Sequence, residues 1–547
     1  MIKLLAVFFI SSSVFLFSGN NVSSQLTGDY TSQRSVNKIF LKTKKELPVS
    51  EATGEISFYS GISSLDKKLE SYKVEKVKRV FKLNNGRKDL YEKFEMNRIY
   101  VLFLSEENKF DIETIVSNLN QEENVEYCEP VSSGYAAGVK ELQTKNIFSD
   151  NSPNDEMFYK QWYLQNNGSV DPTSGGLPKV GADIKIIYAW DIEEGSDEVV
   201  VAILDSGIKD DHPDLKDRIW INSGEIANNG IDDDYNGYVD DIKGWDFAYD
   251  DKRPEDGFGH GTNIATVIGA STNNRIGFAG VDKKCRIMNC KNLNTYNSGE
   301  YDWWSESIKY AVDNGADIIN MSEGGDDYSK VLKTAIEYAV ESGVLVVSAM
   351  MNKGDNRNYY PAGFDGVMAV GATDTDDKRC RRFSWGGGSC WGDNISVVAP
   401  GNKIYGLDYE NIDNYEVFWS GTSQSTAIVS AIASLLLAQN ISRNSDDLKK
   451  IIKYTSRDLV GDPREDTPGW DQYYGYGRVD SFAALTYESS SDPEKLEEIT
   501  KEKKRKEIES VEENNKNNYN KDKATPENKN KEEVKSKSEY TEPSKPK

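Results

Sequence analysis

The pattern of apolar and polar positions changes most clearly near residue 153. Beyond it, the apolar runs Val199–Leu204 and Val344–Val347 alternate with helix-like stretches around Thr334–Glu341 and Ile428–Gln439. Parallel strands buried on both faces have such runs, and the intervening stretches are typical of the helices that cover them. We therefore predict an α/β domain over residues 153–488, with an open, mostly parallel sheet and helices on both faces.

A smaller unit precedes this domain. Its pattern predicts an alternating strand, a buried strand, a helix and a final extended segment, at Val74–Phe81, Ile99–Leu104, Ile112–Leu119 and Val125–Pro130. This order is typical of a small α+β domain, which we place at residues 25–138. We interpret residues 139–152 as a linker.

The two ends of the chain have different compositions. Lys3, the apolar stretch Leu4–Phe17 and the small residues of Ser18–Ser24 follow the order of a secretory signal peptide, here residues 1–24. A membrane anchor is the alternative, but the stretch is short and three serines interrupt it. Ile428–Ala438 is also too short to cross a bilayer. We therefore expect a secreted protein without a membrane span once the signal is removed.

The net charge of −24 belongs to the part of the chain that folds. Residues 489–547 contain fifteen Lys or Arg and fifteen Asp or Glu, so this Lys-, Glu- and Asn-rich tail is neutral. With so few apolar residues the tail is predicted to be disordered. An acidic folded part argues against nucleic acid as a partner.

Five cysteines are present, an odd number for a secreted chain. Cys285 and Cys290 flank a predicted strand, and five extended residues span about 16 Å, beyond the roughly 7 Å between bridged α-carbons. Cys380 and Cys390 flank three glycines, Gly386–Gly388, which allow the chain to fold back. We predict a disulfide between Cys380 and Cys390.

Only two histidines are available as a base, His212 and His260. His212 lies in a polar turn before Pro213, where the ordinary role of a surface or turn residue is favoured. His260 lies between Gly259 and Gly261, ahead of an apolar helix. Glycines on both sides allow a close approach of backbone and ligand, so His260 is the better candidate.

An aspartate and a serine occupy positions that suit chemistry. Asp205 follows the apolar strand Val199–Leu204, where open α/β sheets place ligands, although a helix cap is the common alternative. Ser423 precedes a long apolar helix. Serines there are usually N-caps, yet the same position gives a nucleophile backbone donors for an oxyanion.

Taken together, three blocks resemble the signatures of the subtilisin-like serine proteases (the subtilase family), in the chain order Asp, His, Ser. They are Val201–Gly207, Gly259–Thr262 and Gly421–Ser423. The resemblance implies a subtilisin-like fold and peptide-bond hydrolysis by Asp205, His260 and Ser423 through an acyl-enzyme. It also implies that Asn352 is an oxyanion donor and that Ser322, Glu323 and Gly324 bind peptide or protein substrates as an added strand.

The resemblance extends beyond the catalytic blocks. The first domain resembles an inhibitory prodomain, so we expect a zymogen that is cut between Pro130 and Asn151 and that keeps its own prodomain as an inhibitor. The secretory context and the tail are similar to those of subtilases from malaria parasites and related apicomplexans.

A loop rich in aspartate suggests a metal. Residues 229–241 contain the pattern D-x-D-x-N-G, which suits a Ca²⁺ shell of carboxylates and carbonyls. An EF-hand would require Glu where Lys243 stands, so the match covers only half of such a loop. We favour structural Ca²⁺ over a plain acidic turn, with the side chains of Asp232, Asp234, Asn236 and Asp240 as ligands.

Three departures from the family pattern leave a second function open. Met351 stands where a glycine usually precedes the asparagine, Ala427 stands in place of a proline, and Glu323 replaces an apolar residue. The alternative to an active endopeptidase is therefore a weak or inactive pseudoprotease that binds other proteins. A calcium-binding adhesion protein is a third possibility, which only the Asp232 loop supports. We further expect Glu323 to disfavour acidic substrate side chains.

Overall fold

The computed structural model describes residues 34–48, 60–83, 87–105, 107–137, 139–142, 152–169 and 177–487. The predicted signal peptide, most of the predicted linker and the predicted tail lie outside the described residues. Within the described part, no helix is long and apolar enough to cross a membrane. Residues up to Tyr487 form one compact unit.

The first domain is the predicted α+β unit, with more elements than the sequence pattern indicated. Its elements are β1 (Arg34–Thr43), α1 (Ser63–Ser71), β2 (Val74–Arg79), α2 (Lys88–Lys93), a 3₁₀ turn (Met96–Arg98), β3 (Ile99–Leu104), α3 (Ile112–Leu119) and β4 (Val125–Ala136). The strands pair antiparallel in the order β4-β1-β3-β2. Asp111 caps α3 by accepting from the N–H of Thr114 at 2.9 Å, which accounts for the start of that helix.

The second domain is built on seven strands in the order β14-β13-β12-β10-β6-β8-β7. The strands are β6 (Val200–Asp205), β7 (Gly244–Asp246), β8 (Arg286–Lys291), β10 (Ile318–Met321), β12 (Leu345–Ala349), β13 (Met368–Thr373) and β14 (Ile395–Pro400). Every pairing between them is parallel. The predicted parallel sheet is confirmed.

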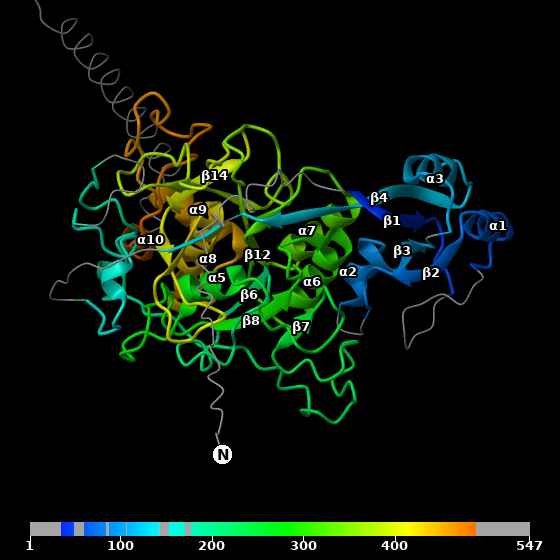
Figure 1. The fold of residues 1–547 in the computed structure, drawn as a ribbon, viewed down its shortest axis with the longest axis horizontal. Helices are drawn as coiled ribbons and strands as arrows, with labels where there is room; N and C mark the ends of the chain where they lie inside the picture. Colours follow the sequence, from blue (N-terminus) through cyan, green and yellow to red (C-terminus); the bar gives the residue numbers. More distant parts are fainter. Residues whose placement is uncertain are drawn as a thin grey trace, which may run out of the picture. The chain divides into compact units, whose positions relative to one another are not determined.

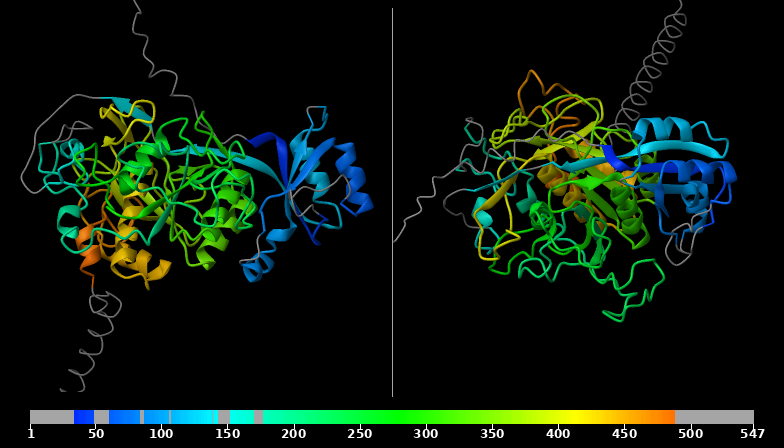
Figure 2. Two further views of the ribbon diagram at one scale, coloured as in Figure 1. Left: turned by 90° about the horizontal axis from the view of Figure 1, so that it is seen from below. Right: turned by 45° about the vertical axis from the view of Figure 1, so that its right-hand side comes forward.

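Helices cover both faces of this sheet, because successive side chains of a strand point to opposite sides. Val201 and Ile203 of β6 belong to one core cluster, and Ala202 and Leu204 belong to the other. The helices are α4 (Ile186–Ala189), α5 (His260–Gly269), α6 (Tyr301–Asp313), α7 (Lys330–Glu341), α8 (Thr422–Gln439), α9 (Ser445–Thr455) and α10 (Ser481–Leu485), with a 3₁₀ turn at Phe158–Lys160. Helices α5 and α8 pack in the first cluster and α6 and α7 in the second, around the sheet seen in Figures 1 and 2.

Five short strands in the described part of the chain lie outside the seven-stranded sheet. They are β5 (Val139–Leu142), β9 (Gly299–Glu300), β11 (Glu323–Gly324), β15 (Ile404–Tyr405) and β16 (Val417–Ser420). The long strand β4 extends from the first domain toward the second (Figure 1). There it pairs with β9 and β11. One strand therefore belongs to both domains.

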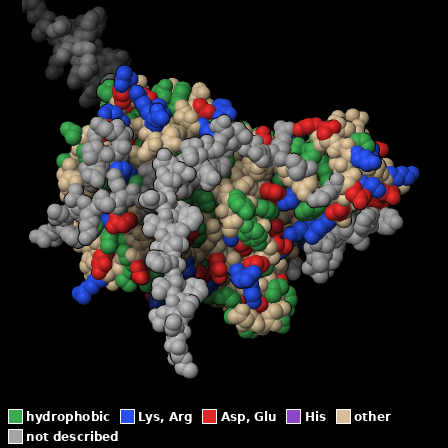
Figure 3. Space-filling view, in the orientation of Figure 1, with side chains coloured by type: hydrophobic (Ala, Val, Ile, Leu, Met, Phe, Trp, Pro, Cys, Tyr) green, Lys and Arg blue, Asp and Glu red, His purple; other side chains and the backbone are tan. Residues whose placement is uncertain are grey.

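Polar contacts also join the two domains. Glu129 of β4 accepts from the Ser329 hydroxyl at 2.7 Å, and Tyr91 of α2 donates to Asp313 at 3.0 Å. Lys38 of β1 lies 3.0 Å from a carboxylate oxygen of Asp302. On the face drawn in Figure 3, acidic and basic side chains are intermingled over the described residues.

Candidate active site

Asp205 is the last residue of β6, at the carboxyl end of a central parallel strand. Its side chain is buried, and its Oδ1 accepts from the N–H of Ser206 at 2.7 Å. The same carboxylate faces His260, so it does not cap a helix. Of the two readings that the sequence left open, the ligand position at the end of a strand is the one observed.

His260 begins α5 and is fully buried. Its Nδ1 lies 2.8 Å from Oδ1 and 2.9 Å from Oδ2 of Asp205. A carboxylate accepts hydrogen bonds, so Nδ1 carries the imidazole proton and Nε2 is left as the basic nitrogen. Nε2 is buried and has no hydrogen-bond partner among the described residues.

Glycines hold this histidine close to the aspartate. Gly259, which precedes α5, has φ +98°, a left-handed conformation that favours glycine. A Cβ on Gly261 would lie 2.1 Å from the carbonyl oxygen of Gly207, in the loop that follows Asp205. Bulkier residues would push the helix away from the strand, so the sequence reading of glycines on both sides of His260 is confirmed.

The other histidine lies in a turn, as predicted, but not at the surface. His212 is buried, its Nδ1 accepts from the N–H of Asp214 at 3.1 Å, and its Nε2 lies 3.1 Å from the carbonyl oxygen of Ile412. Both ring nitrogens are thus engaged in holding two loops together.

Ser423 is the second residue of α8 and is fully buried. Gly421 is the N-cap residue, so the alternative that Ser423 caps the helix is wrong. The Ser423 hydroxyl donates to the carbonyl oxygen of Ser322 at 3.0 Å and, in a shorter contact, to that of Ala137. The backbone N–H of Ser423 also donates to the Ala137 oxygen, at 3.2 Å.

Asn352 lies beside this serine with its amide in a defined orientation. Its Oδ1 accepts from the N–H of Thr422 at 2.9 Å. Its Nδ2 is buried and has no partner among the described residues. Because the oxygen end is held, the donor end is available for a charge that forms on a bound carbonyl group.

The chain's own strand β4 occupies the cleft in front of these residues. Tyr135 and Ala136 pair with Gly324 and Glu323 of β11, and the N–H of Ala137 donates to the carbonyl oxygen of Ser322 at 2.9 Å. On the far side of residue 138, β5 pairs antiparallel with β16. Backbone of this chain therefore lies on both sides of Ser423.

Glu323 lies in strand β11, beside the cleft, as predicted. Its side chain, however, presents no exposed charge to the cleft. The residue is fully buried, and Oε1 accepts from the Asn292 amide at 2.8 Å. Burial, and next the carboxylate of Asp205, hold the pKa of Glu323 well above its usual value. A buried, neutral carboxyl group offers no charge to repel acidic substrates, so the geometry does not support the expectation that Glu323 selects against them, and that expectation stays a prediction.

The other two departures from the family pattern are also buried. Met351 has φ +74°, which is strained for a side chain other than glycine. A Cβ on Gly324 would lie 2.7 Å from the Met351 sulfur, so this methionine fills the space beside β11. Ala427 is buried within α8, whose hydrogen-bonded backbone continues through the position.

The acidic loop gathers three carboxylates, of which the sequence pattern named two. Glu225, Asp232 and Asp234 bring one oxygen each to within 4.8 Å of the others. Burial, and next the neighbouring carboxylate of Asp234, raise the pKa of Asp232, although the backbone N–H groups of Gly237 and Asn236 act to lower it. Glu225 was missed because it lies seven positions before the D-x-D-x-N-G pattern, and no regular spacing marks it.

The two remaining predicted ligands are placed differently. Asp240 is paired with Lys252 at 2.8 Å and accepts from the N–H of Asn229 at 3.0 Å. Asn236 lies next to the three carboxylates, with its N–H 3.0 Å from oxygens of both Asp232 and Asp234. The structure therefore brings Asn236 to the cluster and engages Asp240 with a lysine.

The predicted disulfide is absent. All five cysteines are free and buried. The N–H of Ser389 donates to the Cys380 carbonyl at 2.7 Å, so the two segments pair as expected from the glycines between them. However, Cys380 packs with Phe383 and Cys390 packs with Met350, in separate clusters, so the two thiols face different sides. Cys285 directly precedes strand β8 and Cys290 lies within it, so extended backbone separates them, as predicted for a pair that cannot bond.

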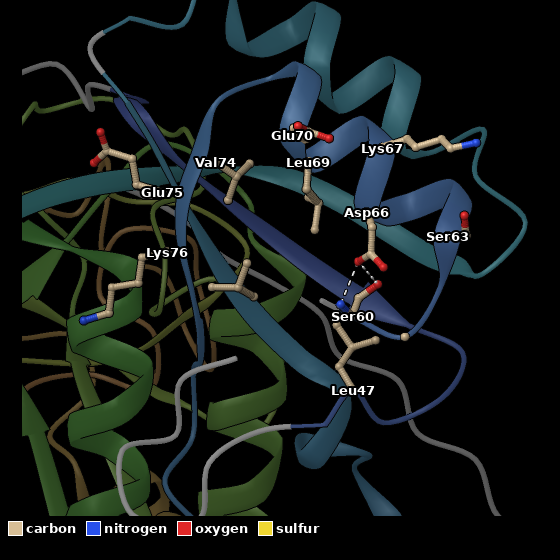
Figure 4. A pocket seen from close by; sticks show the side chains of 12 residues that line it. Leu47, Ser60, Ser63, Asp66, Lys67, Leu69, Glu70, Val74, Glu75 and Lys76 are labelled. Carbon is tan, nitrogen blue, oxygen red and sulfur yellow. Dashed lines mark hydrogen bonds between the residues drawn. The ribbon is translucent and has the colours of Figure 1, made fainter. Parts of the chain in front are cut away.

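One pocket among the described residues lies away from this site. Figure 4 shows it in the first domain, with a volume of about 550 Å³ and with Leu47, Ser60, Asp66 and Val74 among its lining residues. Ser60 donates to Asp66 at 2.6 Å at its edge. No residue of the second domain lines it, so it is not part of the cleft.

Comparisons with known proteins agree with the geometry. A profile described as "Subtilase family" matches residues 196–477, a range that includes Asp205, His260, Asn352 and Ser423. Thermitase of Thermoactinomyces vulgaris is 32% identical over 336 residues, which are 61% of this chain and 100% of thermitase. Subtilisin-like protease 1 of Plasmodium falciparum is 32% identical over 273 residues, 46% of this chain and 39% of that protein.

A solved structure shares the fold. Fervidolysin from Fervidobacterium pennivorans, described as a keratinolytic enzyme related to subtilisin, aligns with a TM-score of 0.58 at 21% identity, covering 83% of this chain and 61% of that one. The parallel sheet and the family match agree with each other. The chain belongs to the subtilase family and is a subtilisin-like serine endopeptidase.

Proposed function

We propose that the chain is a secreted zymogen that cuts its own Ala137–Gly138 bond, with Asp205, His260 and Ser423 as the catalytic triad. One observation carries the proposal: the N–H and the hydroxyl of Ser423 both donate to the carbonyl oxygen of Ala137. A nucleophile and an oxyanion donor thus meet at one carbonyl of the chain itself. The bond lies within the interval Pro130–Asn151 that the sequence indicated.

The residues present can perform the hydrolysis in two steps. The Ser423 hydroxyl turns toward the Ala137 carbonyl carbon and bonds to it, while its proton passes to Nε2 of His260. The C–N bond breaks as His260 returns that proton to the nitrogen of Gly138. A water then attacks the ester carbon and gives a proton to His260. The ester C–O bond breaks as His260 passes that proton to the Ser423 oxygen, and the new carboxylic acid at Ala137 loses its remaining proton to solvent.

Three groups stabilise the charges that form. Asp205 holds the imidazole through Nδ1 and stabilises its protonated state. The Ser423 N–H and the Nδ2 of Asn352 are the donors for the oxyanion. The Nδ2 of Asn352 has no hydrogen-bond partner among the described residues, which fits a donor that binds an oxygen only when negative charge develops on it.

The first domain serves as the inhibitor in this proposal. Its strand β4 remains paired with β9 and β11 whether or not the Ala137–Gly138 bond is intact, so the cleft stays filled after the cut. Protein or peptide substrates then enter the same positions once β4 has left. The apolar residues 4–17 support export of the zymogen.

We also propose that the loop of Glu225, Asp232 and Asp234 holds structural Ca²⁺. Hard oxygen donors of this kind suit Ca²⁺, and three carboxylates this close together repel one another without a cation. Asn236 hydrogen-bonds to two of them and holds the loop. Bound Ca²⁺ would neutralise the cluster and take no part in hydrolysis.

The test of the catalytic proposal uses the full-length chain and its Ser423→Ala variant. We expect the unsubstituted chain to convert into two fragments, the larger beginning at Gly138, and then to react with a serine-directed fluorophosphonate. Ser423→Ala should stay intact and unlabelled. An intact, unlabelled wild-type chain would support a binding protein with a protease fold instead, and a new N-terminus elsewhere would overturn the assigned bond.

A further inference from the structure

A tryptophan lies directly beneath the strand that occupies the cleft. Trp304 is in the first turn of α6 and is fully buried. Its ring packs against that of Tyr301, with centroids 5.0 Å apart and an angle of 31°. Tyr301 is itself buried and donates to the carbonyl oxygen of Asp327 at 3.1 Å. The indole ring is thus enclosed by close packing and cannot shift without disturbing its neighbours.

Glycine residues of two strands, β4 and β9, lie directly against this ring. A Cβ on Gly134 of β4 would lie 2.2 Å from Cη2 of Trp304. A Cβ on Gly299 of β9 would lie 2.3 Å from the indole Nε1. Carbon atoms in contact are normally about 3.5–4.0 Å apart, so neither position accepts a side chain while the ring stays in place.

Gly134 is confined from the other side as well. The same added Cβ would lie 2.6 Å from the carbonyl oxygen of Gly324 in β11. Gly134 is therefore confined between the Trp304 ring on one side and the backbone of β11 on the other. Only glycine fits there without displacing one of the two.

The register of strand β4 fixes Gly134 as the residue that lies against the Trp304 ring. Gly134 pairs with Gly299, and Tyr135 pairs with Gly324. The N–H of Ala136 donates to the Oδ1 of Asn297 at 3.1 Å, and that of Ala137 donates to Ser322. A shift by one residue would turn every side chain to the opposite face, so the strand is held with Ala137 at Ser423.

We propose that the enzyme selects peptide segments with glycine at the fourth residue before the cleaved bond, and that Trp304 is the residue that imposes this choice. The inference rests on the proposed function, since it takes Ala137 as the residue whose carbonyl is attacked. Gly134 is then the fourth residue before the cut. The substrate class is an extended segment of the form Gly-x-x-Ala, as in the chain's own Gly134–Ala137.

The first test follows self-cleavage of the full-length chain. Gly134→Ala is compared with Ser133→Ala, a change at the adjacent position of the same strand. We expect Gly134→Ala to slow the appearance of the fragment that begins at Gly138 by about 10- to 100-fold, the effect of forcing one carbon into a filled space. Ser133→Ala should behave like the unsubstituted chain.

The second test removes the ring. Trp304→Leu, added to Gly134→Ala, should restore part of the lost rate, because the ring contact is gone and the Gly324 carbonyl remains. Trp303→Leu is the matched control: Trp303 is the preceding residue of α6, is only half-buried and lies over Lys38. It should restore nothing. Near-ultraviolet circular dichroism, which does not depend on access to Ser423, identifies the variants that have folded.

The third test uses the self-processed wild-type enzyme and needs no variant. Peptides that differ only by glycine, alanine or leucine at the fourth position before the cut are offered in equal amounts. Preference for glycine supports the proposal. Equal cleavage of all three, or unchanged self-cleavage of Gly134→Ala, overturns it while labelled Ser423 leaves the catalytic assignment standing. A chain that neither labels nor cuts itself overturns the proposed function and, with it, this inference.

Discussion

The backbone N–H of Ser423 donates to the carbonyl oxygen of Ala137 at 3.2 Å, although 286 positions separate the two residues. Ser423 starts a helix beneath the parallel sheet, and Ala137 follows the last strand of the first domain. Their meeting requires both domains to be folded around the same strand. The pairing of β4 with β9 and β11 therefore positions a peptide bond and fills the cleft at the same time.

Asn352 should contribute to turnover far more than to binding. Its Oδ1 is held by the N–H of Thr422, which leaves the Nδ2 donor for the oxyanion. Asn352→Asp keeps the acceptor and removes the donor, so we expect the turnover number on a peptide substrate to fall about 10²- to 10³-fold, with little change in KM. The measurement is steady-state kinetics of the self-processed enzyme.

The control for this change is Asn356→Asp, in the exposed part of the same loop. It should leave both constants near those of the unsubstituted enzyme. An Asn352→Asp enzyme with a normal turnover number, or one in which only KM rises, would show that this amide does not stabilise the transition state.

The arrangement of the parallel domain could be predicted from the sequence because its signals are local. The apolar run Val199–Leu204 is sufficient to identify a buried strand, and glycines around His260 mark a close approach of backbone. These local signals make Asp205 and His260 candidates, whereas the roles of Ser423 and Asn352 follow from the resemblance to the subtilase family.

The features that the sequence did not reveal all depend on contacts between distant segments. The position of Ala137 in the cleft requires the pairing of β4 with β11, which no local pattern encodes. The thiols of Cys380 and Cys390 turn to different sides of one hairpin, and spacing alone cannot show this. The burial of Glu323 likewise follows from the packing of Asn292 and its neighbours against β11.

Glu323 should lower stability at neutral pH. Its pKa is raised above its ordinary value of 4.5, chiefly by burial. The folded state therefore keeps a proton that the unfolded state loses, and the free energy of unfolding falls as pH rises above about 4.5, by up to about 1.4 kcal/mol per pH unit until Glu323 ionises. Glu323→Gln resembles the neutral acid and should remove this loss.

The measurement is thermal unfolding in the Ser423→Ala background, which prevents self-digestion. Glu323→Gln should raise the unfolding midpoint at about pH 8 and change it little at about pH 4. Glu337→Gln on the exposed face of α7 controls for the loss of a surface carboxylate. A midpoint raised equally at both pH values would mean that titration of Glu323 is not the cause.

Removal of Ca²⁺ should destabilise the protein through the loop of Glu225, Asp232 and Asp234. An ion at a hundred times its dissociation constant stabilises the folded state by about 2.7 kcal/mol, so a chelator should lower the unfolding midpoint by several degrees. Glu225→Gln should weaken this dependence, since its oxygen is one of the three that meet. Calorimetry of the Ser423→Ala chain with and without a chelator measures it.

Asp240 provides the comparison for that experiment. Its carboxylate is paired with Lys252, so Asp240→Asn should leave the response to the chelator unchanged. The opposite result, with Asp240→Asn abolishing the response and Glu225→Gln preserving it, would favour the ligand set that the sequence pattern suggested over the one that the structure brings together.

Glu129 should control how long the first domain remains in the cleft after self-cleavage. Its carboxylate accepts from the hydroxyl of Ser329 at 2.7 Å and from the N–H groups of Lys330 and Val331, each at 3.3 Å. These donors lie at the start of α7, where the helix dipole favours a negative charge. A strand residue of the first domain thus caps a helix of the second.

Glu129→Ala removes this cap, with its three hydrogen bonds to the start of α7, and leaves the other contacts of β4 in place. Hydrogen bonds to charged groups contribute about 1.5–3 kcal/mol, so the first domain should dissociate about 10- to 100-fold faster. The measurement is the lag between self-cleavage and the onset of activity on an added peptide. Glu126→Ala is the matched control, because Glu126 lies on the same strand, is exposed and pairs with Lys42 of its own domain at 3.1 Å. A lag that Glu129→Ala leaves unchanged, or that Glu126→Ala shortens equally, would assign inhibition to the backbone pairing of β4 with β9 and β11.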